Sequence, residues 1–225
     1  MIDTTVKVAD KLVGEYDIIP NPWIKEFCNE NQELVSVEFH GITKIRNRAF
    51  QNCTNLALTS LPAGVTSIGV EAFSGCTSLA LTSLPESLTS IGESAFSGCT
   101  NLALTSLPDG VTSIGAGAFN SCTNLALTSL PDGLTSIYAG AFYNCTSLAL
   151  TSLPEGLTTI SFGAFQDCTS LTSITFKGTP TTIESSAFSG CTNLTEIKVP
   201  WSEGAVSGAP WGATNATITY NYVGE

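Results

Sequence analysis

The stretch CTNLALTSLPDGVTSIGAGAF, from Cys99 to Phe119, recurs along most of the chain with small changes. Three of its positions keep a constant step of 23 residues over seven copies, so the repeat organises the whole sequence. The phenylalanine column comprises Phe50, Phe73, Phe96, Phe119, Phe142, Phe165 and Phe188. The cysteine column comprises Cys53, Cys76, Cys99, Cys122, Cys145, Cys168 and Cys191. The isoleucine column comprises Ile45, Ile68, Ile91, Ile114, Ile137, Ile160 and Ile183.

One repeat holds too few apolar residues to fold alone. Burying a large apolar side chain contributes roughly 1.5–3 kcal/mol, whereas ordering the backbone costs about 1–2 kcal/mol for every residue of the unit. Stacked copies bury one continuous apolar column that a single copy leaves open. The repeat therefore predicts a solenoid of about seven coils, each unable to fold without its neighbours.

The composition of one unit suggests where its local structure lies. The segment LTSLP predicts a short strand, which ends at its proline because a proline cannot donate to a ladder. Asp109-Gly110 predicts a turn, and the alternating VTSI predicts a second short strand. GAGAFNSC is consistent with one helical or 3₁₀ turn. Successive coils are expected to lie about 4.8 Å apart.

The repeat resembles the BspA-like class of bacterial leucine-rich repeats. The motif appears as NLALTSLPDGVTSIGAGAFNSCTNL and again as SLTSITFKGTPTTIESSAFSGCTNL, and the resemblance covers roughly residues 33 to 200. It implies an α/β leucine-rich-repeat architecture: a curved right-handed solenoid with short parallel strands on the concave face and short helical or 3₁₀ turns opposite. It also implies a surface or secreted binding role, with no catalytic residues to transfer.

The two ends depart from the repeat, which predicts caps over the exposed coils. We expect an N-terminal cap at residues 1–32, containing PNPWIKEFC, and repeats at residues 33–199. Residues 200–225 are expected to form a C-terminal cap. Its alternating ATITYNYV predicts a closing strand, with Trp201 and Trp211 covering the last coil.

The central repeats leave the strand register open. Three units keep the family spacing of leucine and two further apolar residues, for example Leu171, Ile174 and Phe176. The five LALTSLP units place a threonine at the second apolar position; these are Thr59, Thr82, Thr105, Thr128 and Thr151. Either the threonines stack inside, or the strand shifts so that Leu58 and its equivalents face in. The unshifted register is our expectation.

Composition excludes several classes of function. Eight Lys and Arg against nineteen Asp and Glu give a net charge of −11, which argues against nucleic acid as a partner. We expect no signal peptide, because the first twenty residues lack a continuous apolar segment, and no membrane insertion, because no apolar stretch approaches the roughly 20 residues needed to span a bilayer. His40 is the single histidine, so a catalytic triad that needs a histidine could form only around this residue. We expect neither an enzyme nor a cofactor.

The cysteine column is expected to be a ladder of small buried thiols. Stacked Cβ vectors point the same way and oppose disulfide geometry, and the spacing suits no zinc site. A row of carboxylates also follows the period, at Glu86, Asp109, Asp132 and Glu155. One carboxylate per coil offers too few ligands for calcium, so no metal is expected.

The positions that vary between copies predict the binding surface. LALTSLP is identical in five consecutive units, whereas residues just before Ala-Phe change. The column after the isoleucine holds arginine, glycine, tyrosine, serine and glutamate, which suggests an outward position where glycine is not required. The candidate binding surface comprises Tyr138, Phe162, Glu71, Glu93, Trp201 and Trp211. The two tryptophans have two alternative interpretations, a sugar-stacking platform and the core of the cap.

These candidates point to a binding, adhesion or display module, encoded by a bacterium or a prophage. Its expected partner is a host or bacterial surface protein, and its expected location is the cell surface or the secreted fraction. Glycan or cell-wall binding by the uniform Thr/Ser face is one alternative, and a passive spacer is another. Cytoplasmic and virion-associated locations also remain open.

Overall fold

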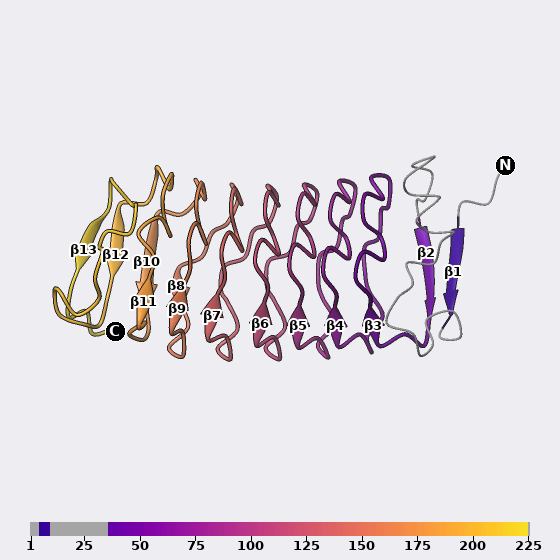
Figure 1. The fold of residues 1–225 in the computed structure, drawn as a ribbon, viewed down its shortest axis with the longest axis horizontal. Helices are drawn as coiled ribbons and strands as arrows, with labels where there is room; N and C mark the ends of the chain where they lie inside the picture. The colour runs from indigo at the N-terminus through magenta and orange to yellow at the C-terminus, as the bar shows by residue number, and fades with distance from the viewer. Residues whose placement is uncertain (1–4, 10–35, 225) are drawn as a thin grey trace.

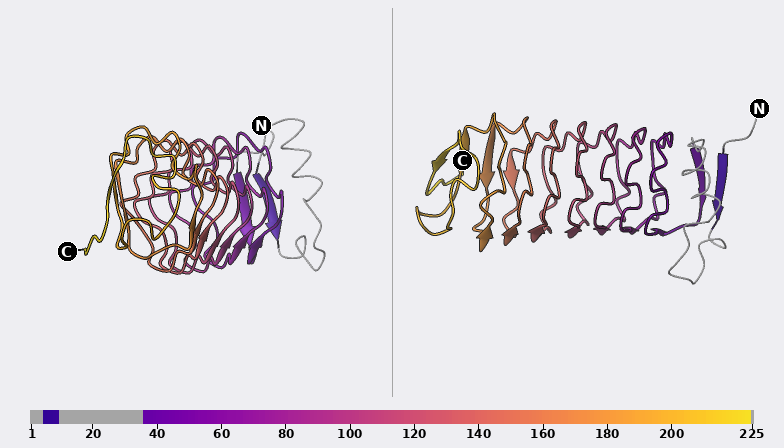
Figure 2. Two further views of the ribbon diagram at one scale, coloured as in Figure 1. Left: turned by 60° about the vertical axis from the view of Figure 1, so that its left-hand side comes forward. Right: turned by 45° about the horizontal axis from the view of Figure 1, so that its top comes forward.

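The parallel solenoid is confirmed by a computed structural model, which describes residues 5–9 and 36–224. The coils stack in a single row from the N-terminal to the C-terminal end (Figure 1). The row is close to straight in the right-hand view of Figure 2, so the strands do not lie on a strongly concave face. The strands are β1 Thr5–Ala9, β2 Ser36–His40, β3 Lys44–Ile45, β4 Ser67–Ile68, β5 Ser90–Ile91, β6 Ser113–Ile114, β7 Ser136–Ile137, β8 Ser152–Leu153, β9 Thr159–Ile160, β10 Ser173–Phe176, β11 Thr182–Ile183, β12 Glu196–Lys198 and β13 Thr217–Thr219.

The strands pair in parallel between coils, as stacking of equivalent segments requires. Residues one repeat apart lie opposite each other, so Ile45 pairs with Ile68 and Ile68 with Ile91. The VTSI side of the coils carries the sheets β3-β4-β5-β6 and β7-β9-β11. A third sheet, β8-β10-β12-β13, lies at the C-terminal end, and β1 pairs with β2 at the other end. The predicted VTSI strand is therefore confirmed, at two residues per coil.

The segment around each Ala-Phe pair is a series of turns, and the described residues contain no helix. Within one coil the Ala72 N–H donates to the Gly69 carbonyl at 3.3 Å, whereas the Phe73 N–H donates to Ala95 of the next coil at 2.8 Å. Glu71 and Gly75 have φ of 53° and 77°, and left-handed residues this close together stop a helix. The expected helical turn is thus replaced by alternating bonds within and between coils.

The expected register of the LALTSLP segments is wrong. In the first of them Leu56, Leu58 and Leu61 are buried, while Thr59 and Ser60 face solvent. The four later units follow the same pattern, burying Leu81, Leu104, Leu127 and Leu150. The segment does not shift its register as a rigid strand. Two consecutive residues, Thr59 and Ser60 in the first unit, both face solvent, so the leucines before and after them can both face the core.

Burial energy explains this choice. A buried leucine removes more apolar surface from water than a threonine, and a threonine inside would also need a partner for its hydroxyl. The cost is regular structure: among these five segments only Ser152–Leu153 forms a strand, so the predicted LTSLP strand is wrong for the other four. Where the spacing is regular, as in Ser173–Phe176, a four-residue strand forms.

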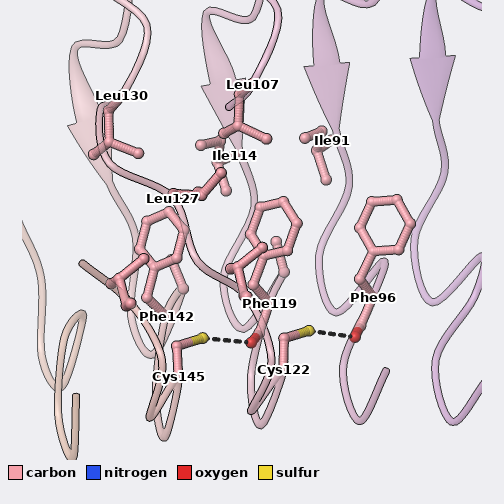
Figure 3. Close-up of a cluster of buried hydrophobic side chains, with 14 of the residues drawn as sticks. Ile91, Phe96, Leu107, Ile114, Phe119, Cys122, Leu127, Leu130, Phe142 and Cys145 are labelled. Carbon is pink, nitrogen blue, oxygen red and sulfur yellow. Dashed lines mark hydrogen bonds between the residues drawn. The ribbon is translucent and has the colours of Figure 1, made fainter. Parts of the chain in front are cut away.

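The phenylalanine column forms the centre of the core. Neighbouring rings lie 5.2–5.5 Å apart between centroids and are tilted by only 3–11°. In Figure 3, Leu107 and Leu130 lie above the rings of Phe119 and Phe142, and Cys122 and Cys145 lie below them. Like side chains therefore contact like side chains along the axis, as the repeat predicts.

The C-terminal end closes the core with aromatic residues. Trp201 and Trp211 are 6% and 0% exposed, and their rings lie 5.2 Å and 6.1 Å from that of Phe176. The expected closing strand corresponds to β13, which pairs with β12. The segment PNPWIKEFC, expected in the N-terminal cap, lies outside the described residues.

Candidate functional site

The positions that vary between coils gather along one edge of the solenoid. We call this the variable edge, meaning the three residues that follow each column isoleucine: 46–48, 69–71, 92–94, 115–117, 138–140, 161–163 and 184–186. Backbone bonds stack these triplets directly on one another. The Gly117 N–H donates to the Ala139 carbonyl at 2.9 Å, and the Gly140 N–H donates to the Phe162 carbonyl at 3.0 Å.

The glycines at the start of the variable edge are required by close packing. A Cβ on Gly69, Gly92 or Gly115 would lie 2.4–2.6 Å from backbone atoms of the preceding coil. Real Cβ atoms do not approach backbone so closely, so these coils stack at this spacing only with glycine. The expectation that glycine is not required in this column is therefore wrong for these three coils.

Tyr138 is the first residue with a Cβ after these glycines, and the sheet breaks where it stands. β6 and β7 are not paired, although both lie in continuous ladders with their other neighbours. Upstream the Gly115 N–H donates to the Ile91 carbonyl at 2.8 Å, and downstream the Ser161 N–H donates to Ile137 at 2.9 Å. The equivalent bond from Tyr138 is absent from this described part of the chain. The Tyr138 Cβ needs space that the earlier spacing does not leave, so the coils separate locally here.

Two aromatic side chains project into solvent next to this break. Tyr138 is 49% exposed and Phe162 is 62% exposed. Within the residues described, Val223 near the chain end is the one other large apolar side chain that is so exposed. Because the Gly140 N–H donates to the Phe162 carbonyl, the triplets of Tyr138 and Phe162 stack on each other, and the two exposed aromatic residues lie on adjacent coils of the variable edge.

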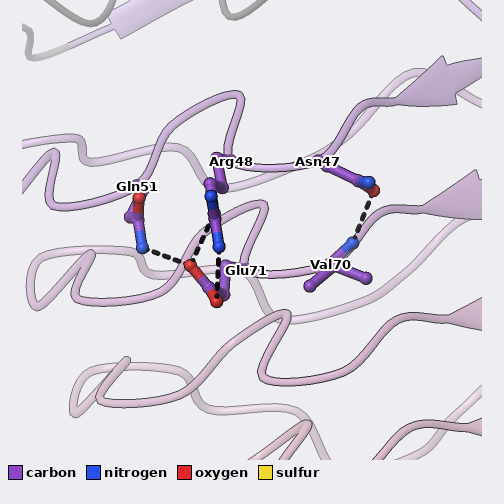
Figure 4. Close-up of polar contacts among 5 residues, drawn as sticks. All are labelled: Asn47, Arg48, Gln51, Val70 and Glu71. Carbon is purple, nitrogen blue, oxygen red and sulfur yellow. Dashed lines mark hydrogen bonds and ion pairs between the residues drawn. The ribbon is translucent and has the colours of Figure 1, made fainter. Parts of the chain in front are cut away.

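Glu71, at the N-terminal part of the variable edge, is occupied within the chain. Its carboxylate lies 2.9 Å from Nε of Arg48 and also accepts a bond from the Gln51 amide (Figure 4). The hydrogen bond from Arg48 lowers the pKa of Glu71, and Glu71 in turn raises the pKa of Arg48. Nearby, the Val70 N–H donates to Asn47 Oδ1 at 2.9 Å. Glu71 is therefore a contact between coils and less available to a partner.

Glu93 is accessible to a partner, and so is Glu184. Both side chains are exposed, and neither makes a hydrogen bond or ion pair with the described part of the protein. Glu184 occupies the same column as Tyr138, so the variable column itself carried the signal that could have selected it. The Glu93 and Glu184 triplets lie on either side of the aromatic pair along the stack.

Trp201 and Trp211 do not belong to an accessible surface. Both are buried against Phe176, and Trp211 Nε1 donates to the Ser207 carbonyl at 2.8 Å. Burial of the rings leaves no face on which a sugar could stack. Their inclusion in the candidate binding surface is therefore wrong, and their burial matches the alternative interpretation, the core of the cap.

The cysteine column is a ladder of buried thiols with one exception. Each thiol from Cys76 to Cys191 donates to the carbonyl of a phenylalanine in the preceding coil, at 2.9–3.0 Å. Burial raises the pKa of Cys76, Cys145 and Cys191 to about 12. Cys53 is disulfide-bonded, which corrects the expectation that all seven stay free. High pKa values and burial make the six free thiols structural groups.

Among the described residues, no group of three or more His, Cys, Asp or Glu side chains is arranged to hold a metal ion. The carboxylate row from Glu86 to Glu155 is exposed to solvent. No helix in the described part of the chain is long and apolar enough to cross a membrane.

Fold and edge together define a class of protein: a parallel repeat solenoid with a uniform core and one variable edge. The model of the BspA-type leucine-rich repeat region, in six copies, matches residues 23–138 and 101–207. The chain therefore belongs to the BspA-type leucine-rich repeat family, as the repeat motif indicated. Proteins of this kind are typically not enzymes.

Solved structures of bacterial leucine-rich repeat proteins are similar to this chain, in agreement with its family. The Treponema pallidum protein TpLRR is 38% identical, with a TM-score of 0.52, over 63% of this chain and 68% of that one. A leucine-rich cell surface protein of Faecalibacterium prausnitzii is 27% identical, with a TM-score of 0.60, over 86% of this chain. This chain spans 58% of the length of the Faecalibacterium protein. No protein with a curated function matches.

Proposed function

We propose that this chain is a non-catalytic binding module that contacts a protein partner through Tyr138 and Phe162 on the variable edge. The observation that carries the proposal is the exposure of these two side chains, 49% and 62%. Among the described residues, Val223 is the one other large apolar side chain that is exposed. Aromatic residues are the usual anchors of protein interfaces, and exposing them to water otherwise brings no gain.

A location at the cell surface or in the secreted fraction, with a role in adhesion or display, completes the proposal. It is supported by the Faecalibacterium relative, which is described as a cell surface protein. The family also supports it, because its repeats stack into a solenoid, and solenoids present the extended surfaces that such proteins use for binding.

Glycan binding is a second candidate with one observation in its favour. The LALTSLP segments expose a threonine in each of five successive coils, at Thr59, Thr82, Thr105, Thr128 and Thr151. A row of hydroxyls at a constant spacing suits a polymer whose own groups repeat. The threonine row lacks the aromatic or arginine anchors that a protein interface uses. The variable edge has such anchors in Tyr138 and Phe162, so we choose it first as the binding surface.

The test compares two variants in capture experiments with bacterial and host surface extracts. Tyr138→Gly with Phe162→Ala restores the glycine of Gly115 and the alanine of Ala116, the residues of neighbouring coils. Thr105→Ala with Thr128→Ala alters the threonine row instead. We expect the first variant to lose the protein captured by the natural chain and the second to keep it. Capture that survives the first variant but not the second, or that a soluble polysaccharide abolishes, would favour glycan binding.

A further inference from the structure

The sequence around the aromatic pair carries acidic side chains and no basic ones. Between residues 49 and 176 the sequence contains seven Asp and Glu and no Lys, Arg or His. Lys177, the first cation after this stretch, lines a surface pocket with Asp132 and Glu155. At the other end, Arg48 is held by Glu71. The described central coils therefore present the aromatic pair in a negative field.

The two carboxylates of the variable edge without a partner lie at defined places relative to this pair. The backbone bonds place the Glu93 triplet two coils before Tyr138 and the Glu184 triplet one coil after Phe162. Coils in a parallel stack are about 4.8 Å apart, so the two carboxylates are separated by about 19 Å along the axis. The triplet between Glu93 and Tyr138 contains only Gly115, Ala116 and Gly117, so no long side chain rises there.

An extended peptide matches this spacing. Extended chains rise about 3.4 Å per residue and direct alternate side chains to the same face. Two side chains six residues apart are then about 20 Å apart on one face, and the two between them on that face lie near the aromatic coils. The matching order of side chains is basic, apolar, apolar, basic at the first, third, fifth and seventh positions.

We propose that the variable edge binds an extended segment of a protein partner in which two Lys or Arg residues, six positions apart, flank two apolar residues. The cations contact Glu93 and Glu184, and the apolar residues contact Tyr138 and Phe162. This inference rests on the proposed function and deepens it by naming the chemistry of the partner. Charge complementarity decides which partner is bound, while the aromatic contacts contribute most of the binding free energy.

A synthetic peptide tests the proposal directly. The probe Lys-Ser-Leu-Ser-Leu-Ser-Lys, capped at both ends, is titrated into the full chain and followed by the NMR signals of Tyr138 and Phe162. We expect saturable shifts at these residues that weaken at high salt. The same peptide with Glu at both ends should bind at least about tenfold more weakly, because it faces like charges.

Matched variants assign the charge effect to the edge. Glu93→Ala and Glu184→Ser introduce the residues that Ala116 and Ser161 occupy in the same columns. Together they should weaken binding of the basic peptide about tenfold and remove most of its salt dependence. Glu86→Ala with Asp109→Ala removes the same charge from the carboxylate row and should leave binding within about twofold of the natural chain.

Several results would overturn the proposal. These are equal binding of the Lys and Glu peptides, shifts that map away from Tyr138 and Phe162, and absence of binding by the basic peptide. None of these results changes the outcome of the capture experiment, which tests the Tyr138 and Phe162 variant against natural extracts. A captured partner that depends on the aromatic pair while the basic peptide fails would thus refute the charge rule alone.

Discussion

Each phenylalanine of the column is held between two identical rings, and Phe119 is in the middle of the stack. Its ring is fully buried, with centroids 5.4 Å from Phe96 and 5.5 Å from Phe142. Removing it takes contacts from two neighbouring coils at once. At the other extreme, Ala116 lies on the variable edge, where the equivalent residues of other coils differ.

The first prediction compares these two residues. Phe119→Ala should lower the free energy of unfolding by about 3–5 kcal/mol, because the cavity lies between two coils that cannot collapse on it. Ala116→Ser should cost less than about 0.5 kcal/mol. Urea unfolding followed by circular dichroism measures both, and similar losses for the two variants would show that the inward face is misassigned.

At the scale of elements, the gap between β6 and β7 divides an otherwise continuous ladder into two sheets. Its position coincides with Tyr138, the point where a column of tightly packed glycines ends. After it, Ser161 and Glu184 keep their inter-coil bonds although both carry a Cβ. One bulky residue therefore changes the stacking geometry once, and the later coils stack on the new arrangement.

The second prediction concerns amide exchange at this gap. The amides of Thr135 and Tyr138 should exchange with deuterium faster than those of Thr112 and Gly115, their equivalents one coil earlier, because the ladder bonds are missing. Tyr138→Gly should close the ladder and slow exchange at both positions. Equal protection of the two coils in the natural chain would contradict the break.

At the scale of the whole molecule, six buried thiols lie along one axis and respond together to alkaline pH. Burial raises the pKa of each one, to about 12 for Cys76, Cys145 and Cys191, from an ordinary value of 9.0. The folded chain therefore keeps protons that the unfolded chain releases above pH 9.0. Since the unfolded state then binds fewer protons, stability must fall as the pH rises through this window.

The third prediction gives the size of that fall. Each thiol contributes a loss of about 1.4 kcal/mol per pH unit once the unfolded thiol is ionised, so six contribute on the order of 8 kcal/mol per unit. Below pH 9.0 these thiols add no pH dependence. Urea midpoints measured from neutral to alkaline pH should show a steep decline, which Cys99→Ala with Cys122→Ala should reduce by about a third. An unchanged slope in that variant would mean that other groups cause the decline.

The candidate site could be predicted only in part. The variation between copies marked Tyr138, Phe162 and Glu93, and the structure exposes all three. The candidate binding surface also included Trp201 and Trp211, because the sequence does not distinguish a cap aromatic residue that covers the core from one that faces solvent. It also included Glu71, whose pairing with Arg48 depends on how two coils are placed side by side.

The sequence by itself determined the parallel solenoid, the 23-residue step and the columns of the core, because identical units that cannot fold alone bury most surface by stacking in phase. Tertiary structure decided that Leu58 faces in while Thr59 faces out, that Gly115 has no room for a Cβ, and that the ladder opens at Tyr138. The physical reason is that a period states which residues recur, whereas facing and spacing depend on the side chains and backbone of the adjacent coil.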